Sequence, residues 1–252
     1  MNELIYIIIA LLAASVGSVM LSGSLLMLNQ KWLEKLSGYL LCLAGGTLIG
    51  SALMGLIPES MEILPVREVL IWVLFGILFF FLLEKFILWR MCRDDNCKRQ
   101  IHTAGPMIII GDAVHNAIDG VVIATSFMTS VELGIFVTVS VVLHEIPQEL
   151  GDFGILIKSG YSKKQALFYN LLSASSAIVA GTVTYFLLDF MEEIVPYALA
   201  VAAASFLYIA LADLIPEMHK ETKAKESVLQ FLLILVGVGV IFLSAASHGH
   251  VH

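Results

Sequence analysis

The chain has 252 residues, of which 59% are hydrophobic and 14% are charged, and its formal net charge is −7. Its mean hydropathy of +0.92 excludes an ordinary soluble domain and is typical of an integral membrane protein. We expect a lipid bilayer as its surroundings and no nucleic-acid partner.

Apolar runs of about 20 residues recur along the chain, the length that a helix needs to cross ~30 Å of hydrocarbon. The runs do not alternate between polar and apolar residues, which favours helices over barrel strands. We expect an all-α integral membrane protein with one transmembrane domain over residues 1–252. Its eight spans lie at about 4–28, 37–57, 68–89, 106–129, 132–157, 165–188, 195–215 and 227–247.

Charge predicts the orientation of these spans. The first run lacks a positively charged leading segment, so we expect it to stay in the protein rather than to be removed as a signal peptide. Of the 14 Lys and Arg residues, all except Arg67 lie in or beside the loops after the first, third, fifth and seventh spans. The positive-inside rule places these loops in the cytoplasm and both termini outside it, in a cell membrane.

Two polar motifs interrupt the apolar fourth and fifth spans: H-N-A-I-D-G from His115 and H-E-I-P-Q-E from His144. A charged side chain at the centre of a bilayer costs about 2.5–3.5 kcal/mol on insertion scales, so such groups face one another, water or an ion. The two histidines lie about 14 Å and 18 Å along their antiparallel helices, near the middle of the membrane.

Helical spacing predicts a metal site between these spans. His115 and Asp119 share a face, as do His144 and Gln148, because each pair is four residues apart. We expect His115, Asp119 and His144 as primary ligands and Gln148 as a weaker one. Asn116 and Glu145 would form an adjoining site. Pro147 should bend or open the fifth helix, as in many transporter sites.

Further polar residues lie on the cytoplasmic side of the histidines and predict a release path for the ion. The residues of this path are Asp112, Glu149 and Asp152, with Asp213, Glu217 and His219 at the inner end of the seventh span. Imidazole and carboxylate together suit zinc and other first-row divalent ions, whereas Mg²⁺ and Ca²⁺ prefer oxygen alone.

Three other interpretations remain. The polar residues can form a hydrogen-bonded network that only joins helices. An intramembrane metalloprotease needs His-Glu-x-x-His, and Gln148 stands where the second histidine belongs. A metal exporter would have the same residues, because the gradient sets the direction.

These motifs resemble those of the ZIP (Zrt/Irt-like) family of divalent-metal transporters, and we identify the chain as a member of bacterial or archaeal type. The resemblance covers the whole chain. It extends to L-I-P-E from Leu56, N-L-L-S-A from Asn170 and the segment from Phe206 to Glu217.

The resemblance implies a transporter rather than an enzyme, without a cofactor, that imports Zn²⁺, and also Fe²⁺, Mn²⁺ or Cd²⁺. It implies a homodimer and a 3+2+3 arrangement of helices with inverted repeats. Spans one, four, five and six would move against the others in an elevator-like motion.

Two residues depart from the family pattern. Many relatives have His where this chain has Gln148, which should weaken the main site. Some bacterial members carry a carboxylate ligand of a second metal in the sixth span, where this chain has Ala177. We therefore expect one principal ion. Cys92, Cys97 and His102 in a basic loop, and the histidines near the C-terminus, offer weaker metal-binding options.

The predicted orientation can be tested by cysteine labelling. In a background with Ser at the native cysteines, Glu62→Cys should react with a membrane-impermeant maleimide on intact cells. Lys163→Cys should react only after the membrane is permeabilised. Labelling of Lys163→Cys in intact cells would refute the orientation.

Overall fold

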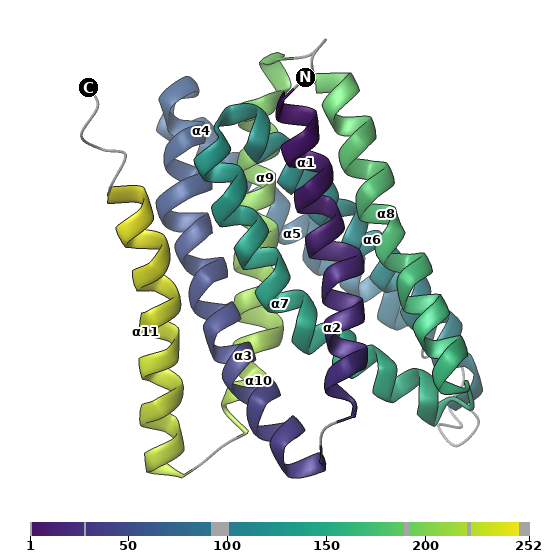
Figure 1. The fold of residues 1–252 in the computed structure, drawn as a ribbon. Helices are drawn as coiled ribbons and strands as arrows, with labels where there is room; N and C mark the ends of the chain where they lie inside the picture. The colour runs from purple at the N-terminus through teal and green to yellow at the C-terminus, as the bar shows by residue number, and fades with distance from the viewer. Residues whose placement is uncertain (1, 28, 92–100, 189–191, 221–222, 247–252) are drawn as a thin grey trace.

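The computed structural model describes residues 2–27, 29–91, 101–188, 192–220 and 223–246. Within this part the chain is helical without strands, and eight helical segments are long and apolar enough to cross a membrane, which confirms the predicted all-α fold and span count. Their bounds are Glu3–Leu25, Gly38–Ile63, Val66–Phe86, Ile108–Thr129, Val131–Ile157, Lys163–Leu187, Val195–Met218 and Ala224–Leu243. Helix α1 begins and α11 ends at the same end of the bundle (Figure 1).

Five spans are built around single α-helices. These are α5 (Val66–Met91), α6 (Ile101–Thr129), α7 (Val131–Lys158), α8 (Lys163–Leu188) and α11 (Ala224–Ala246). Side chains cap several of them: Ser130 Oγ accepts from the Leu133 amide at the start of α7. At the start of α8, Ser162 and Gln165 form a reciprocal capping box.

Three spans contain a π-helical turn. The first consists of α1 (Asn2–Leu12), the π turn Ala13–Gly17 and α2 (Ser18–Leu25). The second consists of α3 (Gln30–Ser51), the π turn Ala52–Leu56 and α4 (Ile57–Ile63). The seventh consists of α9 (Val195–Tyr208), the π turn Ile209–Leu214 and α10 (Ile215–Met218).

The π turns of the second and seventh spans each end at the leucine of the same sequence, Leu-Ile-Pro-Glu, and its proline lies in the first turn of the following helix. Proline has no amide hydrogen, so the backbone before it loses one helical bond and can widen. This match favours the inverted repeat, which stays a prediction.

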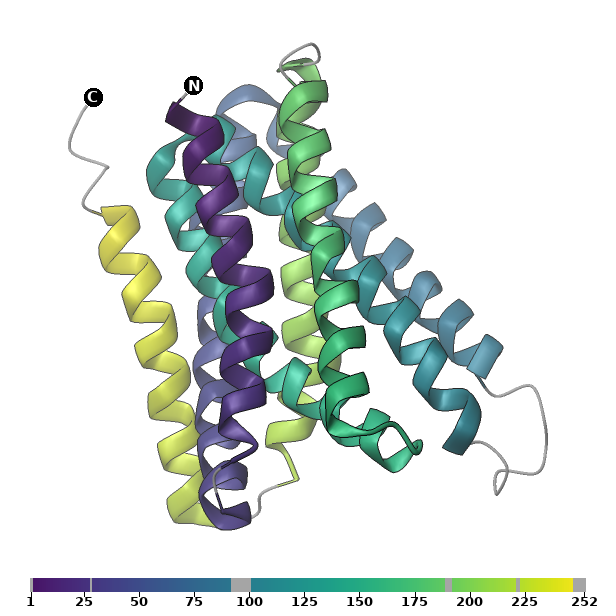
Figure 2. The same ribbon diagram turned by 45° about the vertical axis from the view of Figure 1, so that its right-hand side comes forward.

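Pro147 lies inside α7 without ending the helix. The ribbon of α7 changes direction in its C-terminal half, which Figures 1 and 2 both show. The helix therefore bends rather than opens, the first of the two outcomes expected from the proline.

Glycines let two pairs of helices approach until their backbones touch. A Cβ on Gly46 of α3 would lie 2.3 Å from the carbonyl oxygen of Ile234 on α11, and one on Gly237 would lie 2.6 Å from that of Leu43. A Cβ on Gly120 of α6 would lie 2.2 Å from the carbonyl oxygen of Ala177 on α8. Close packing of this kind is a main source of helix association in lipid.

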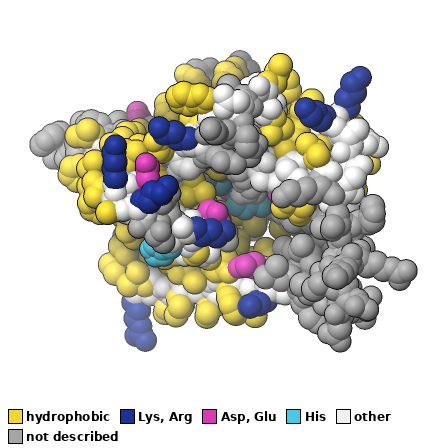
Figure 3. Space-filling model, turned by 90° about the horizontal axis from the view of Figure 1, so that it is seen from below, with side chains coloured by type: hydrophobic (Ala, Val, Ile, Leu, Met, Phe, Trp, Pro, Cys, Tyr) yellow, Lys and Arg dark blue, Asp and Glu magenta, His cyan; other side chains and the backbone are white. Residues whose placement is uncertain are grey.

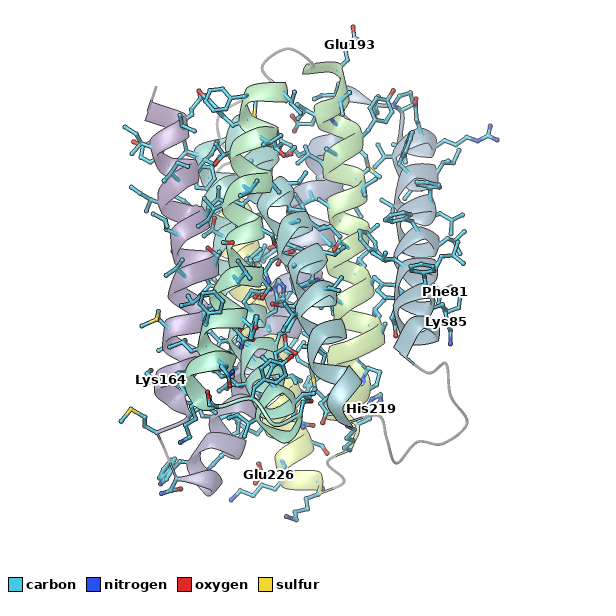
Figure 4. The ribbon with its side chains drawn as sticks, turned by 90° about the vertical axis from the view of Figure 1, so that its right-hand side faces the viewer. Phe81, Lys85, Lys164, Glu193, His219 and Glu226 are labelled. Carbon is cyan, nitrogen blue, oxygen red and sulfur yellow. The ribbon has the colours of Figure 1, made fainter. Side chains whose placement is uncertain are left out.

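The membrane-facing surface is apolar. Helix α11 lies at one edge of the bundle and α5 at the other (Figure 2), and both expose many large apolar side chains, such as Phe75 and Leu243. The lower face carries numerous Lys and Arg side chains around a hollow (Figure 3). Glu193 lies at the opposite end from Lys164, His219 and Glu226 (Figure 4).

The glycine contacts predict a contrast between two substitutions on α11. Gly237→Ala should destabilise the protein by about 1–3 kcal/mol because the new methyl group overpacks against α3. Gly239→Ala is the matched control, since a Cβ there meets nothing within 4 Å. Thermal unfolding of the purified variants measures both. Equal melting temperatures for the two variants would contradict the close α3–α11 contact.

Candidate metal centre

The turn between α6 and α7 brings the two histidines together. A single residue, Ser130, separates the two helices, and it lies 15 residues after His115 and 14 before His144. Antiparallel helices with equal lengths of chain on both sides of a turn place these positions at the same depth. The two histidine rings lie edge to face, with centroids 5.4 Å apart.

Four side-chain atoms meet between the helices, and we call them the four-ligand group: His115 Nε2, His144 Nε2, Asp119 Oδ2 and Glu145 Oε1. His115 Nε2 lies 3.2 Å from His144 Nε2, 3.7 Å from Asp119 Oδ2 and 3.4 Å from Glu145 Oε1. His144 Nε2 lies 3.1 Å from Asp119 Oδ2 and 3.7 Å from Glu145 Oε1.

These distances match the coordination geometry of zinc. Zinc commonly holds four ligands in a tetrahedron at about 2.0–2.2 Å. The edge of a tetrahedron is ~1.63 times the distance from its centre to a corner, which gives about 3.3–3.6 Å between ligand atoms. Five of the six separations are 3.1–3.7 Å, which bracket this range, and the Asp119 and Glu145 oxygens lie within 4.8 Å of each other. The group can therefore bind such an ion with small movements.

A backbone contact orients the His144 ring. His144 Nδ1 lies 3.0 Å from the carbonyl oxygen of Ser140, which can only accept, so Nδ1 carries the proton and donates it. In the neutral ring this leaves the lone pair on Nε2 directed into the four-ligand group. Ser140 is itself held, because its hydroxyl shares a 2.7 Å hydrogen bond with that of Ser51 on α3.

The carboxylates of this group are buried without hydrogen-bond donors. Asp119 is 1% exposed and Glu145 is 0% exposed, and within the described part of the chain none of their four carboxylate oxygens has a hydrogen-bond partner. Buried polar groups are almost always satisfied. The two carboxylates face the two imidazoles at 3.1–3.7 Å, an arrangement that suits a cation shared among all four side chains.

The remaining predicted ligands, Asn116 and Gln148, both contact Asp112, which precedes His115 on α6 by three residues. Asn116 Nδ2 donates to Asp112 Oδ1 at 2.9 Å, and Gln148 Nε2 donates to the same oxygen at 3.3 Å. Ser173 of α8, which the sequence analysis missed, donates to Asp112 Oδ2. Glu145, expected beside the site, instead completes the four-ligand group, and Gln148 contacts Asp112.

A second set of carboxylates adjoins the first. Single oxygens of Asp112, Glu145 and Glu149 lie within 4.8 Å of one another. All three residues are buried, at 5%, 0% and 0% exposure. Both oxygens of Glu149 lack a hydrogen-bond partner among the described residues. The Asp152 side chain is partly buried.

The other predicted positions are more scattered. Glu217 and His219 are exposed at the end of α10, where Glu217 pairs with Lys220. The side chains of Asp213 and His102, and all of Cys92, Cys97 and the C-terminal histidines, lie outside the described residues.

His115 is the most accessible member of the four-ligand group, with 20% of its side chain exposed, against 1–2% for the other three. It lines a cavity of about 170 Å³ between α5, α6 and α9. Glu84 and Tyr208, which hydrogen-bond to each other, lie in the same cavity. The cavity, lined mostly by apolar side chains, places His115 and Glu84 of α5 on one shared space.

Comparisons with known proteins show which family the chain resembles. Residues 90–245 match the family described as ZIP Zinc transporter. The chain is 39% identical over 152 residues to Zinc transporter ZIP10 of Danio rerio, covering 58% of this chain and 18% of that protein. It is 42% identical over 132 residues to Zinc transporter ZIP4 of Homo sapiens, covering 52% and 20%.

Another relative is Metal cation symporter ZIP14 of Bos taurus, 38% identical over 159 residues that cover 60% of this chain and 32% of that protein. The chain thus spans less than a third of the length of each of these three relatives. All three are animal proteins, so the expected bacterial or archaeal type remains a prediction.

Proposed function

The chain belongs to the ZIP zinc transporter family, and we propose that it carries a divalent metal ion, zinc foremost, across a membrane towards the cytoplasm. The observation that carries the proposal is the four-ligand group, in which the N–N and N–O separations of 3.1–3.7 Å are close to the edge lengths of a zinc tetrahedron. Fe²⁺, Mn²⁺ and Cd²⁺ are further candidate cargoes, because imidazole–carboxylate sites bind several divalent ions.

The ion leaves the four-ligand group along polar side chains. Asp112, Glu149 and Asp152 continue from it towards the expected cytoplasmic end, and Glu217 and His219 lie at that end on α10. We include Asp213 in the same path on sequence grounds. The basic lower face around a hollow (Figure 3) supports this end as the cytoplasmic one.

The movement that we propose is elevator-like. Backbone contact at Gly120 supports α6 and α8 moving as one body, and contact at Gly46 supports α3 and α11 as another. The hydrogen bond between Ser51 and Ser140 crosses between these bodies and can exchange partners at little cost. An apolar cavity of about 520 Å³ between α5, α6 and α9 leaves room for displacement.

We propose further that the protein is a homodimer in the cell membrane with both termini outside the cytoplasm. Two alternatives are less well supported. An exporter would use the same residues with the opposite gradient. A metalloprotease would need a second histidine on α7, but the fourth residue after His144 is Gln148, which donates a hydrogen bond to Asp112.

Sealed liposomes containing the purified protein and an internal zinc dye test the function. We expect zinc-dependent dye fluorescence that is saturable and absent from empty liposomes. The double variant His115→Ala/His144→Ala should lose uptake, since a carboxylate pair alone cannot replace the hydration of the ion. The matched control is His219→Ala, an exposed histidine in the same protein. Normal uptake by the double variant would refute the site.

The fourth ligand can be identified by comparing two variants on α7. Glu145→Gln should weaken zinc binding about tenfold or more, because loss even of residues that only support metal ligands costs about 10–100-fold. Gln148→Ala should weaken it less, since the Gln148 amide contacts Asp112 rather than the four-ligand group. Isothermal titration of both proteins with zinc gives the ratio. A larger loss of zinc affinity in Gln148→Ala than in Glu145→Gln would identify Gln148 as the fourth ligand instead.

A further inference from the structure

We propose that the apolar cavity between α5, α6 and α9, which we call the lipid cavity, holds one acyl chain of a membrane phospholipid whose headgroup carries an ammonium. Its volume of about 520 Å³ lies within the usual range of ligand sites. The cavity lies outside the four-ligand group. Lipid binding therefore stands apart from the proposed function, and only the effect of the lipid on transport rests on that function.

The length of the cavity suits an acyl chain in one leaflet of the bilayer. Its lining runs from Trp72 to Phe80 on α5, from Ile118 to Val122 on α6 and from Ile194 to Ala202 on α9. Eight residues separate the ends on α5 and on α9, which is about 12 Å along a helix. Half of the hydrocarbon layer is about 15 Å deep. The cavity thus begins near the end of the bundle where Glu193 lies (Figure 4) and reaches towards the middle of the membrane.

The chemistry of the lining favours an acyl chain over water. The lining consists of aromatic and aliphatic side chains, whereas a buried water molecule needs about two to four polar partners. An empty space of this size would deprive the lining of dispersion contacts. The acyl chains that surround the protein can supply these contacts without the loss of a hydrogen bond.

The cavity is continuous with the lipid-facing surface of the protein. Phe79 and Ile194 both line the cavity and are exposed, at 45% and 40%. Towards its inner end, Phe80 and Ala202 are buried, at 8% and 3% exposure. A chain can therefore enter from the bilayer between exposed side chains, and its end then lies against buried ones.

The charged groups near the mouth of the cavity suit an ammonium headgroup. Tyr197 lines the cavity and donates a 3.1 Å hydrogen bond to Glu68 Oε1. Glu193 is exposed and directly precedes the lining residue Ile194. Two carboxylates in this position attract an ammonium group and repel an anionic headgroup. Phosphatidylethanolamine should therefore bind in preference to phosphatidylglycerol.

A chain in this cavity lies between the helices that the proposed movement separates. A Cβ on Gly76 of α5 would lie 2.5 Å from the Cβ of Ala204 on α9, so these two helices pack closely and form one wall. The facing wall belongs to α6, where the lining residue Ile118 directly precedes Asp119 of the four-ligand group. Movement of α6 past α5 and α9 must displace or deform the chain, so an occupied cavity should slow transport.

Photolabelling locates the lipid in the wild-type protein. The full-length protein is reconstituted with phosphatidylethanolamine that carries a diazirine at the end of one acyl chain, then irradiated, digested and analysed by mass spectrometry. We expect label on Ile118 or Ala202 at the inner end of the cavity, because Ala202 is buried from the surrounding bilayer. Label confined to exposed side chains such as Leu82 would overturn the site.

Native mass spectrometry measures how firmly the lipid is held. One phosphatidylethanolamine per chain should be retained in preference to phosphatidylglycerol. Ala198→Phe puts a phenyl ring into the cavity and should weaken this retention about tenfold or more, the scale of overpacking effects. Gly239→Phe on α11 is the matched control, since a Cβ there meets nothing within 4 Å. It should retain the lipid as the wild type does.

Two results of this measurement would refute the lipid site. One is equal retention of lipid by Ala198→Phe and Gly239→Phe. The other is loss of a dimer instead of a lipid from Ala198→Phe, which would assign the cavity to a second copy of the chain. Thermal unfolding shows whether Ala198→Phe is folded, and if it is not, photolabelling of the wild type decides the question alone.

Zinc uptake tests the effect on transport separately. Uptake should be slower in phosphatidylethanolamine liposomes than in phosphatidylglycerol liposomes, and this difference should be larger for the wild type and Gly239→Phe than for Ala198→Phe. An equal difference in all three proteins, with label still on Ala202, would refute the effect on transport and leave the lipid site standing. No uptake in any liposome would refute the proposed transport function, while the two binding measurements would still decide the lipid site.

Discussion

The site depends on one constraint, the single-residue turn that joins α6 to α7. Ser130 caps α7 through its hydroxyl, and Gly134 packs directly against the Phe127 ring, where a Cβ would lie 2.3 Å from the ring. The two helices therefore have almost no freedom to slide past each other. Because each histidine is nearly the same number of residues from this turn, a local backbone feature sets the geometry of a site deep in the membrane.

Hydropathy and helical spacing predict much of this molecule. Span lengths reflect the thickness of hydrocarbon, so all eight spans can be located from the sequence, and charge patterns suggest their orientation. The depth of His115 and His144 follows from counting residues. Counting residues does not show whether Glu145 or Gln148 is the fourth ligand. Spacing on one helix defines a face, but it does not define which side chains of that face the neighbouring helix contacts. The Asp112 carboxylate decides that choice by accepting the Gln148 amide. The hydrogen bond from Ser173 to Asp112 depends on how α8 packs against α6, which no local sequence motif encodes.

Two kinds of contact join the helices in the interior: close backbone contacts and hydrogen bonds between small hydroxyl side chains. Glycine-mediated contacts join α6 to α8 and α3 to α11 through backbone atoms, which leaves each pair little freedom to rearrange. Small hydroxyls meet between α3 and α7, where Ser51 contacts Ser140, and a large apolar cavity lies between α5, α6 and α9. Rigid pairs with an adaptable boundary are what a protein needs when one part must shift while a metal site stays intact.

The ligands of the four-ligand group also determine its electrical charge. A metal ion binds imidazole in its neutral form and carboxylate in its ionised form. In these forms the four side chains carry a charge of −2, which a divalent ion cancels. In the elevator-like movement that we propose, the loaded group would move as a neutral complex, on which the transmembrane potential does no work. An empty group that kept this negative charge would experience about 2.3 kcal/mol per charge for every 100 mV. A potential that is negative inside would thus drive the empty group outward, so the membrane voltage would act on the return step of the cycle rather than on the delivery of the ion.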